Sequence, residues 1–146
     1  MIIIGYPGVG KSTLSRKNKG IIDYDSSMFV KEDGWEESYV ERAIGLSDQD
    51  YIVCVSCHKK VQDLLKDYTG KIVVVYPSLT LHDFWIDKLQ TRYQKNHSPE
   101  NKRALMRCLS NYCEDILELQ ELPYTKIEIK TEDYSLEQLL EEVKND

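Results

Sequence analysis

A cluster of glycines near the start of the chain is followed at once by a lysine and two hydroxyl residues. Its spacing, from Gly5 to Gly10-Lys11-Ser12, matches the phosphate-binding pattern G-x-x-x-x-G-K-[ST]. Glycines let a backbone wrap closely around phosphates, and the successive N–H groups of such a turn form an anion site. Lys11 would neutralise the β- and γ-phosphates, and the Ser12 hydroxyl would ligate Mg²⁺. We therefore predict that this stretch, here called the glycine loop (residues 5–13), binds ATP through Gly5, Pro7, Gly8, Val9, Gly10, Lys11, Ser12 and Thr13.

Two carboxylates and two hydroxyls follow a second apolar run at residues 21–25. Asp23 and Asp25 are two positions apart, so they point to the same side of a strand, and Ser26 and Ser27 come directly after them. Asp25 would accept the proton of an acceptor hydroxyl during phosphoryl transfer, and Asp23 would hold a water in the Mg²⁺ shell. We expect all four residues to bind the acceptor. The alternative is a turn whose polar side chains only cap the backbone.

The third apolar run, residues 51–55, is not followed by an acid. It leads into Ser56-Cys57-His58-Lys59, whereas Asp50 lies at the wrong end of the run to reach the site. Ser56 could assist the metal through a water molecule. Asp23 and Asp25 are therefore the carboxylates that we expect to assist the metal and to accept the proton.

A basic stretch lies in the second half of the chain. Residues 88–107 hold six basic residues against the single acid Glu100. In this stretch Lys88 and Arg92 are four positions apart, as are Arg103 and Arg107, so each pair shares a helix face. We interpret residues 88–107 as a lid that closes on the phosphates, with Arg92 as the strongest candidate for stabilising the transferred phosphoryl group. A solvated helix face is the alternative.

Residues 35–46 carry further candidates for acceptor binding. Arg42 could reach a phosphate of the acceptor, and Trp35 or Tyr39 could stack on a base. The spacing of the two aromatic residues is equally typical of a buried helix face.

Four cysteines raise the question of a metal or haem site. Cys54-Val55-Ser56-Cys57-His58 matches the C-x-x-C-H haem-attachment pattern. However, Cys54 and Cys57 are three positions apart, so on a strand they would point to opposite sides, and no leader for export is evident. A zinc site with Cys108 and Cys113 would have poor spacing. We interpret the cysteines as free thiols, mostly buried.

The elements that must position these residues alternate along the chain. Apolar runs typical of strands occupy residues 2–4, 21–25, 51–55, 71–76 and 125–129, the last alternating as an edge strand does. Helical spacing occupies residues 11–18, 35–46, 61–68, 81–93, 101–119 and 136–143, with Gly20 expected to end the first helix and Ser135 to cap the last. Such alternation predicts an α/β fold, a parallel sheet with helices on both faces, and ligands beyond the carboxyl ends of the strands.

Length and composition narrow the class of protein. The 146 residues, with 41% hydrophobic and 30% charged, predict one globular domain over residues 1–146. The net charge of −6 makes non-specific binding of nucleic acid an unlikely function. No apolar run is long enough to span a membrane and no signal peptide is evident, so we expect a cytoplasmic protein.

The glycine loop, the Asp-x-Asp of residues 23–25 and the basic helices after the fourth strand together resemble the small P-loop kinases. These include nucleoside and nucleotide kinases of the adenylate kinase type, gluconate kinase and the kinase domain of polynucleotide kinase. The resemblance implies a P-loop NTPase three-layer sandwich whose five-stranded parallel sheet has the order 2-3-1-4-5, with a short helical lid. It also implies an acceptor-binding segment at about residues 23–47 and the lid at about residues 88–107. The Asp-Gly-[Phe]-Pro segment typical of adenylate kinases is missing.

These features favour an ATP- and Mg²⁺-dependent kinase that transfers the γ-phosphoryl group to a nucleoside or nucleotide. A sugar acid or the 5′-hydroxyl of a polynucleotide is the alternative acceptor. A regulatory module that binds ATP without turnover is the alternative outside catalysis. A GTPase switch would need an Asn-Lys-x-Asp sequence to read the base, and the chain has none. The sequence indicates neither the oligomeric state nor the preferred base of the donor.

Overall fold

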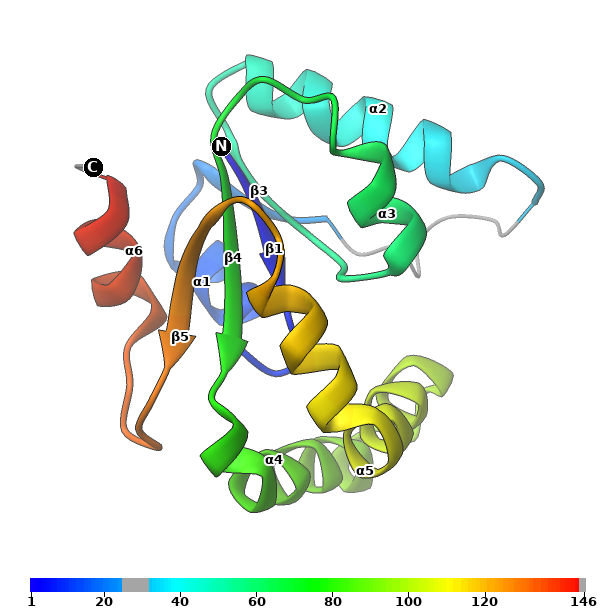
Figure 1. Ribbon diagram of the computed structural model, residues 1–146, viewed down its shortest axis with the longest axis vertical. Helices are drawn as coiled ribbons and strands as arrows, with labels where there is room; N and C mark the ends of the chain where they lie inside the picture. Colours follow the sequence, from blue (N-terminus) through cyan, green and yellow to red (C-terminus); the bar gives the residue numbers. More distant parts are fainter. Residues whose placement is uncertain (25–31, 145–146) are drawn as a thin grey trace.

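The computed structural model describes residues 1–24 and 32–144 of the chain and has an α/β fold. Its sheet has five strands, all paired in parallel, in the order β2-β3-β1-β4-β5 (Figure 1). The expected strand order and the parallel pairing are therefore confirmed. The strands are β1 (Ile2–Gly5), β2 (Ile21–Asp23), β3 (Ile52–Val55), β4 (Ile72–Pro77) and β5 (Thr125–Ile129).

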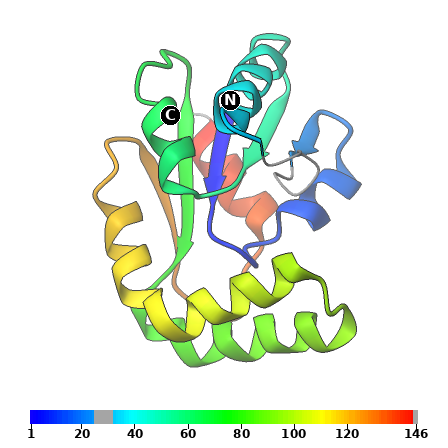
Figure 2. The same ribbon diagram turned by 90° about the vertical axis from the view of Figure 1, so that its right-hand side faces the viewer.

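Helices cover both faces of this sheet. One face carries α1 (Lys11–Lys17) and α6 (Leu136–Lys144). The opposite face carries α2 (Trp35–Asp48), α3 (Lys59–Leu64) and the second half of α5 (Pro99–Gln120), as the turned view in Figure 2 shows. The central strands β1 and β4 are buried along their whole length, because both faces of a parallel sheet are covered.

A helical hairpin lies beyond the carboxyl ends of the strands. A short 3₁₀ turn, η2 (Leu79–Leu81), leads from β4 into α4 (His82–Lys95), and the first half of α5 packs back along α4 (Figures 1 and 2). Ser98 caps α5, since its hydroxyl accepts the N–H of Asn101 at 3.1 Å and Pro99 stands at the first helical position. Residues 88–107 lie within this hairpin.

Two helix ends differ from the sequence prediction. Helix α1 ends at Lys17, and the Asn18 side chain accepts the N–H of Gly20 at 2.8 Å. Gly20 does not have a positive φ, so it is not the left-handed cap that we expected, because Asn18 makes the turn instead. Helix α3 spans only Lys59–Leu64 rather than residues 61–68. The Ser135 cap is confirmed, since its hydroxyl accepts the N–H of Gln138 at 3.3 Å.

Within the described residues, none of the helices combines the length and the apolar character that a crossing of a lipid bilayer requires.

Candidate functional site

The glycine loop connects the carboxyl end of β1 to the first turn of α1. Gly8 and Gly10 have φ values of 90° and 110°, whereas Val9 between them is not in the positive region. This alternation turns consecutive N–H groups to one side of the chain, which makes a concave anion site. No acceptor within residues 1–24 and 32–144 receives the N–H groups of five loop residues, Gly8, Gly10, Lys11, Ser12 and Thr13. The loop therefore presents a set of unsatisfied backbone donors at the start of a helix.

Lys11 lies against the loop from which it starts. Its ammonium donates to the Gly5 carbonyl at 3.0 Å. A side chain at Gly5 would lie 3.0 Å from Lys11 Cδ and 3.1 Å from Val9 Cγ2, so only glycine leaves room for the lysine stem. Lys11 also lies near enough to β3 to oppose the effect of burial on Cys54, whose pKa burial raises to about 12. The structure thus holds a cation beside the free N–H groups.

The outer side of the loop is held by two aromatic residues that the sequence analysis did not single out. The fully buried Trp85 of α4 donates its indole N–H to the Pro7 carbonyl at 2.8 Å. The Tyr134 hydroxyl, in the segment before α6, donates to the Val9 carbonyl at 2.8 Å. Because these partners are 78 and 125 positions away along the chain, no local pattern could have revealed them.

A hollow of about 410 Å³ opens beside the loop and α1. Lys88 of α4 forms part of its wall: the Lys88 ammonium donates to the Tyr134 hydroxyl at 2.9 Å and lies 4.6 Å from the centre of the Trp85 ring. Burial, and secondly the charge of Arg92, lower the pKa of Lys88. The lining residues come from the loop, α1, α4 and the segment that leads into α6: Val9, Gly10, Thr13, Leu14, Lys17, Lys88, Glu132, Tyr134, Ser135, Leu136 and Glu137.

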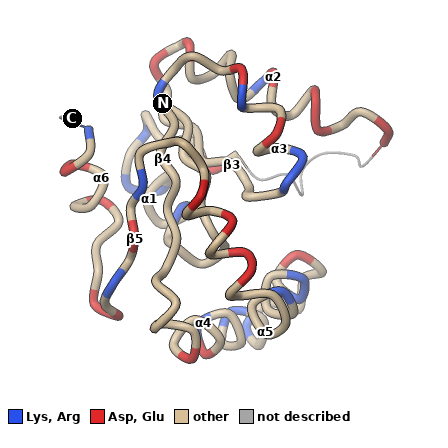
Figure 3. The backbone as a smooth tube through the Cα atoms, viewed as in Figure 1, with Lys and Arg blue, Asp and Glu red and all other residues tan. Residues whose placement is uncertain are grey.

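Of the four basic residues expected to form the lid, the structure brings only Lys88 into contact with residues that hold the loop. Arg92 instead donates from Nε to the Asn101 side chain at 2.9 Å and ties α4 to α5. Arg103 pairs with Glu100 on the surface of α5. Figure 3 shows the basic residues of the hairpin beyond the strand ends and the acidic residues along the second half of α5. The structure therefore favours Lys88 over Arg92 as the cation nearest the loop.

Arg107 lies at a bend in α5. Asn111 has non-helical backbone angles (φ −131°, ψ 19°), and Arg107 makes a two-bonded ion pair with Asp115 across the bend, with Nε 3.0 Å from the carboxylate. Residues eight positions apart lie about 12 Å apart along a straight helix, so the bend is what lets them meet. The carbonyl of Cys108, next to the bend, accepts a hydrogen bond from His82 at 2.7 Å.

The charges of Arg107 and Asp115 influence residues at the glycine loop and just after β3. Burial raises the pKa of the Cys57 thiol, and the charge of Lys11 opposes that rise. From α5, the charge of Asp115 raises the same pKa and that of Arg107 lowers it. Burial likewise raises the pKa of Tyr6 in the loop, with a further contribution from Asp115. The bend in α5, the end of β3 and the glycine loop are therefore close enough to interact electrostatically.

Two of the expected acceptor residues, Asp23 and Arg42, lie on β2 and α2. Asp23 ends β2 and pairs in register with Cys54 of β3. Its charge adds to the rise in the pKa of the Cys54 thiol that burial causes, whereas the charge of Lys11 opposes that rise. Asp25, Ser26 and Ser27 lie outside the described residues. Arg42 is exposed on α2.

The two aromatic candidates of α2 differ in exposure. Trp35 is half-buried, with its ring at right angles to that of His58 and 6.2 Å from it. Tyr39 is completely buried, its ring stacks on Tyr24, and its hydroxyl donates to the Tyr24 carbonyl at 2.6 Å and accepts the N–H of Ser56 at 3.1 Å. Stacking of a base on Tyr39 is therefore not supported, because both its ring and its hydroxyl are used in the core. The alternative reading of Tyr39 as a core residue is the one that the structure favours.

Ser56 directly follows β3, at the position where the sequence lacks an acid. Its hydroxyl oxygen is buried, and no residue in the described part of the chain bonds to it. A buried polar atom normally has a partner, so a water molecule is the expected partner of this oxygen. Ser12, in the first turn of α1, and Asp23, at the end of β2, are the other two residues expected to take part in binding Mg²⁺.

The cysteines do not form a metal centre with other ligands. Cys54 and Cys108 are buried, Cys57 is half-buried and Cys113 is exposed, and all four are free thiols. Within residues 1–24 and 32–144, no three His, Cys, Asp or Glu residues lie together as a metal site would require.

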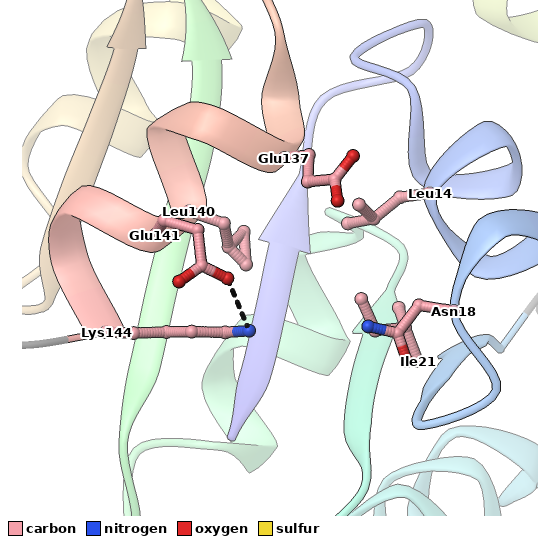
Figure 4. A pocket seen from close by; sticks show the side chains of 7 residues that line it. All are labelled: Leu14, Asn18, Ile21, Glu137, Leu140, Glu141 and Lys144. Atoms are coloured by element: carbon pink, nitrogen blue, oxygen red, sulfur yellow. Dashed lines mark hydrogen bonds and ion pairs between the residues drawn. The ribbon is translucent and has the colours of Figure 1, made fainter.

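A second, much smaller hollow of about 20 Å³ separates α1 from α6. Figure 4 shows Leu14, Asn18 and Ile21 on one side and the α6 side chains on the other, with Lys144 bonded to Glu141 at 3.2 Å. The space is about that of one water molecule, so we assign it no ligand.

The comparisons with known proteins identify a similar fold and no family. No protein-family model matches the chain, and neither does any curated protein. Among solved structures, the crystal structure of an uncharacterized protein from Eubacterium ventriosum ATCC 27560 is similar, with a TM-score of 0.56 and 10% sequence identity. The alignment covers 99% of this chain and 98% of that protein. At this identity the likeness concerns the fold alone.

Proposed function

We propose that the chain is a P-loop kinase that transfers the γ-phosphoryl group of ATP to a nucleoside or nucleotide. The observation that carries the proposal is the glycine loop, with its alternating backbone angles, its five unsatisfied N–H groups and the Lys11 ammonium beside them. A triphosphate supplies the negative oxygens that such a set of donors requires. The position of the loop at the carboxyl edge of β1, a central strand, is where ligands of parallel sheets bind.

The hollow beside the loop supports a nucleotide rather than a free phosphate. Its volume of about 410 Å³ falls within the range of small-molecule sites, and it begins at Gly10 and Thr13, at the start of α1. The Tyr134 ring and the Lys88 stem give it the mixed apolar and polar wall that a base and a ribose would contact. A triphosphate in the loop would thus have its nucleoside in this hollow.

The residues divide the reaction between them. The loop N–H groups and Lys11 hold the β- and γ-phosphates, and the basic hairpin over the site would exclude water. Asp25 takes the proton of the acceptor hydroxyl as its oxygen bonds to the γ-phosphorus and the bond to the ADP oxygen breaks. Mg²⁺, held by Ser12 and through water by Asp23 and Ser56, would neutralise charge on the phosphate oxygens.

Phosphoryl transfer is tested by measuring ADP release with Mg²⁺ and ATP against a panel of nucleosides, nucleoside monophosphates, sugar acids and 5′-hydroxyl oligonucleotides. We expect turnover with a nucleoside or a nucleoside monophosphate. Turnover only with a sugar acid or an oligonucleotide would replace the acceptor class, and no turnover with any of them would contradict the kinase proposal.

The variant Asp25→Asn separates a kinase from a module that only binds ATP. We expect it to lose phosphoryl transfer and to keep ATP binding, because an amide cannot take the proton. Wild-type protein that binds ATP and transfers phosphate to nothing in the panel would favour the regulatory alternative.

A further inference from the structure

Two peptide planes of the glycine loop are fixed from outside the loop. Trp85 donates to the Pro7 carbonyl and Tyr134 donates to the Val9 carbonyl, both at 2.8 Å, and Tyr134 is also 3.4 Å from the Gly8 carbonyl. Within one peptide unit the C=O and the following N–H lie in the same plane and point in opposite directions. The bond to Pro7 therefore sets the direction of the Gly8 N–H, and the bond to Val9 sets that of the Gly10 N–H.

These two N–H groups are among those that have no acceptor within residues 1–24 and 32–144. Glycine at positive φ rotates with little penalty, so Gly8 and Gly10 alone would leave their N–H groups free to turn away from a ligand. Binding would then include the cost of ordering the loop. Hydrogen bonds on the carbonyl side remove that freedom before any ligand arrives.

Building on the proposed function, we propose that Tyr134 and Trp85 are positioning residues that hold the Gly8 and Gly10 N–H groups toward the phosphates of the donor. Tyr134 acts through the Val9–Gly10 peptide and Trp85 through the Pro7–Gly8 peptide. Neither residue needs to contact a phosphate for this role. Their contribution is a loop whose donors point the same way with and without nucleotide.

Other contacts of the two residues agree with this role. Trp85 is completely buried and packs on Gly8, where a side chain would lie 3.1 Å from the indole nitrogen. The Tyr134 hydroxyl accepts from the Lys88 ammonium at 2.9 Å, which leaves its single hydrogen for Val9. Burial raises the pKa of Tyr134 to about 12, so this hydrogen is present throughout the physiological pH range.

The test measures ATP affinity in the presence of Mg²⁺ for Tyr134→Phe and Trp85→Phe. Each variant keeps an aromatic ring and loses the donor, and we expect each to weaken ATP binding about three- to tenfold, as loss of one hydrogen bond does. Tyr68→Phe is the matched control, because its hydroxyl also makes one bond of 2.8 Å, to Ser47, which lies beside Met1 at the amino-terminal end of β1, away from the glycine loop. We expect the control to bind ATP as the wild type does.

Inorganic tripolyphosphate, measured by its displacement of ATP, tests whether the effect acts on the phosphates. We expect Tyr134→Phe to weaken tripolyphosphate and ATP by similar factors. A loss for ATP alone would mean that the Tyr134 hydroxyl acts on the nucleoside rather than on the loop, and would overturn the proposal. So would Tyr134→Phe and Trp85→Phe variants that bind ATP as tightly as Tyr68→Phe.

The variant Lys88→Met tests a route through the neighbouring cation. It keeps the packing on both rings and removes the ammonium. If Tyr134→Phe has no further effect in this background, the hydroxyl acts through Lys88 and the assignment to Val9 is wrong. A wild-type protein that binds neither ATP nor tripolyphosphate would instead contradict the proposed function itself, so the two failures can be told apart.

Discussion

A methyl group added at Gly8 measures how closely α4 packs against the glycine loop. Gly8 has a φ of 90°, and an added Cβ would lie 3.1 Å from Leu89 Cδ2 and 3.1 Å from Trp85 Nε1. The backbone conformation costs a residue with a side chain about 1–2 kcal/mol. Crowding against two packed side chains adds about 1–3 kcal/mol. We therefore expect Gly8→Ala to lower the free energy of unfolding by about 2–5 kcal/mol.

Two other glycines separate these contributions. Gly10 has a φ of 110°, and an added Cβ would meet only Leu136 Cδ2, at an ordinary contact distance of 3.8 Å. Gly10→Ala should therefore cost only the backbone part, about 1–2 kcal/mol. Gly45 lies inside α2 with nothing within 4 Å, so Gly45→Ala should stabilise the protein by about 0.5–1 kcal/mol.

Urea unfolding followed by circular dichroism measures all three variants on one scale. The expected order of stability is Gly45→Ala, wild type, Gly10→Ala and then Gly8→Ala. If Gly8→Ala were no less stable than Gly10→Ala, α4 would not pack on the loop as described. The assigned contact between Trp85 and the loop would then lose its basis.

Three further predictions concern the residues around the loop. Tyr39→Phe should lower the free energy of unfolding by about 1–3 kcal/mol in urea, because it removes two hydrogen bonds of the buried Tyr39 hydroxyl, to the Tyr24 carbonyl and from the Ser56 N–H; an unchanged unfolding midpoint would contradict these two bonds. Asp115→Asn should cost at most about 1 kcal/mol, and less in high salt, because the Arg107 side chain is 65% exposed; a larger, salt-independent loss would contradict this. Because burial raises the pKa of Cys54 from 9.0 to about 12, its thiol stabilises the fold fully below pH 9, and this contribution is lost as the pH rises toward 12. Cys54→Ala should therefore reduce the loss of stability measured between these two pH values, and an equal loss in wild type and variant would refute the assignment.

The sequence predicts the local parts of this structure well, because their signals are local. Unbroken β-branched runs identify the central strands, and the spacing of residues 5–13 gives the loop before any coordinates. The Ser135 cap likewise depends on a contact three positions away. The prediction that Gly20 caps the first helix was wrong, because the side chain of the nearby Asn18 makes the turn instead.

The parts that sequence reasoning missed depend on long-range packing. Nothing in the helical spacing of residues 101–119 marks the bend at Asn111. His82 of α4 bonds to the Cys108 carbonyl beside the bend, and Arg107 and Asp115 of α5 pair across it. Periodicity placed Tyr39 on a helix face but could not distinguish a base-stacking surface from the core. Arg92 shares a helix face with Lys88, but it donates a hydrogen bond to Asn101 on the next helix, which the spacing within one helix could not reveal.

The central claim is that the glycine loop binds a triphosphate through its backbone N–H groups and Lys11. Calorimetric titration of the protein with ATP and Mg²⁺ tests it most directly, with Lys11→Met as the comparison. We expect the wild type to bind one nucleotide saturably. We expect Lys11→Met to bind ATP about 10- to 100-fold more weakly, because it loses a charged hydrogen-bond donor. Wild type without saturable binding, or equal affinities for the two proteins, would contradict the claim.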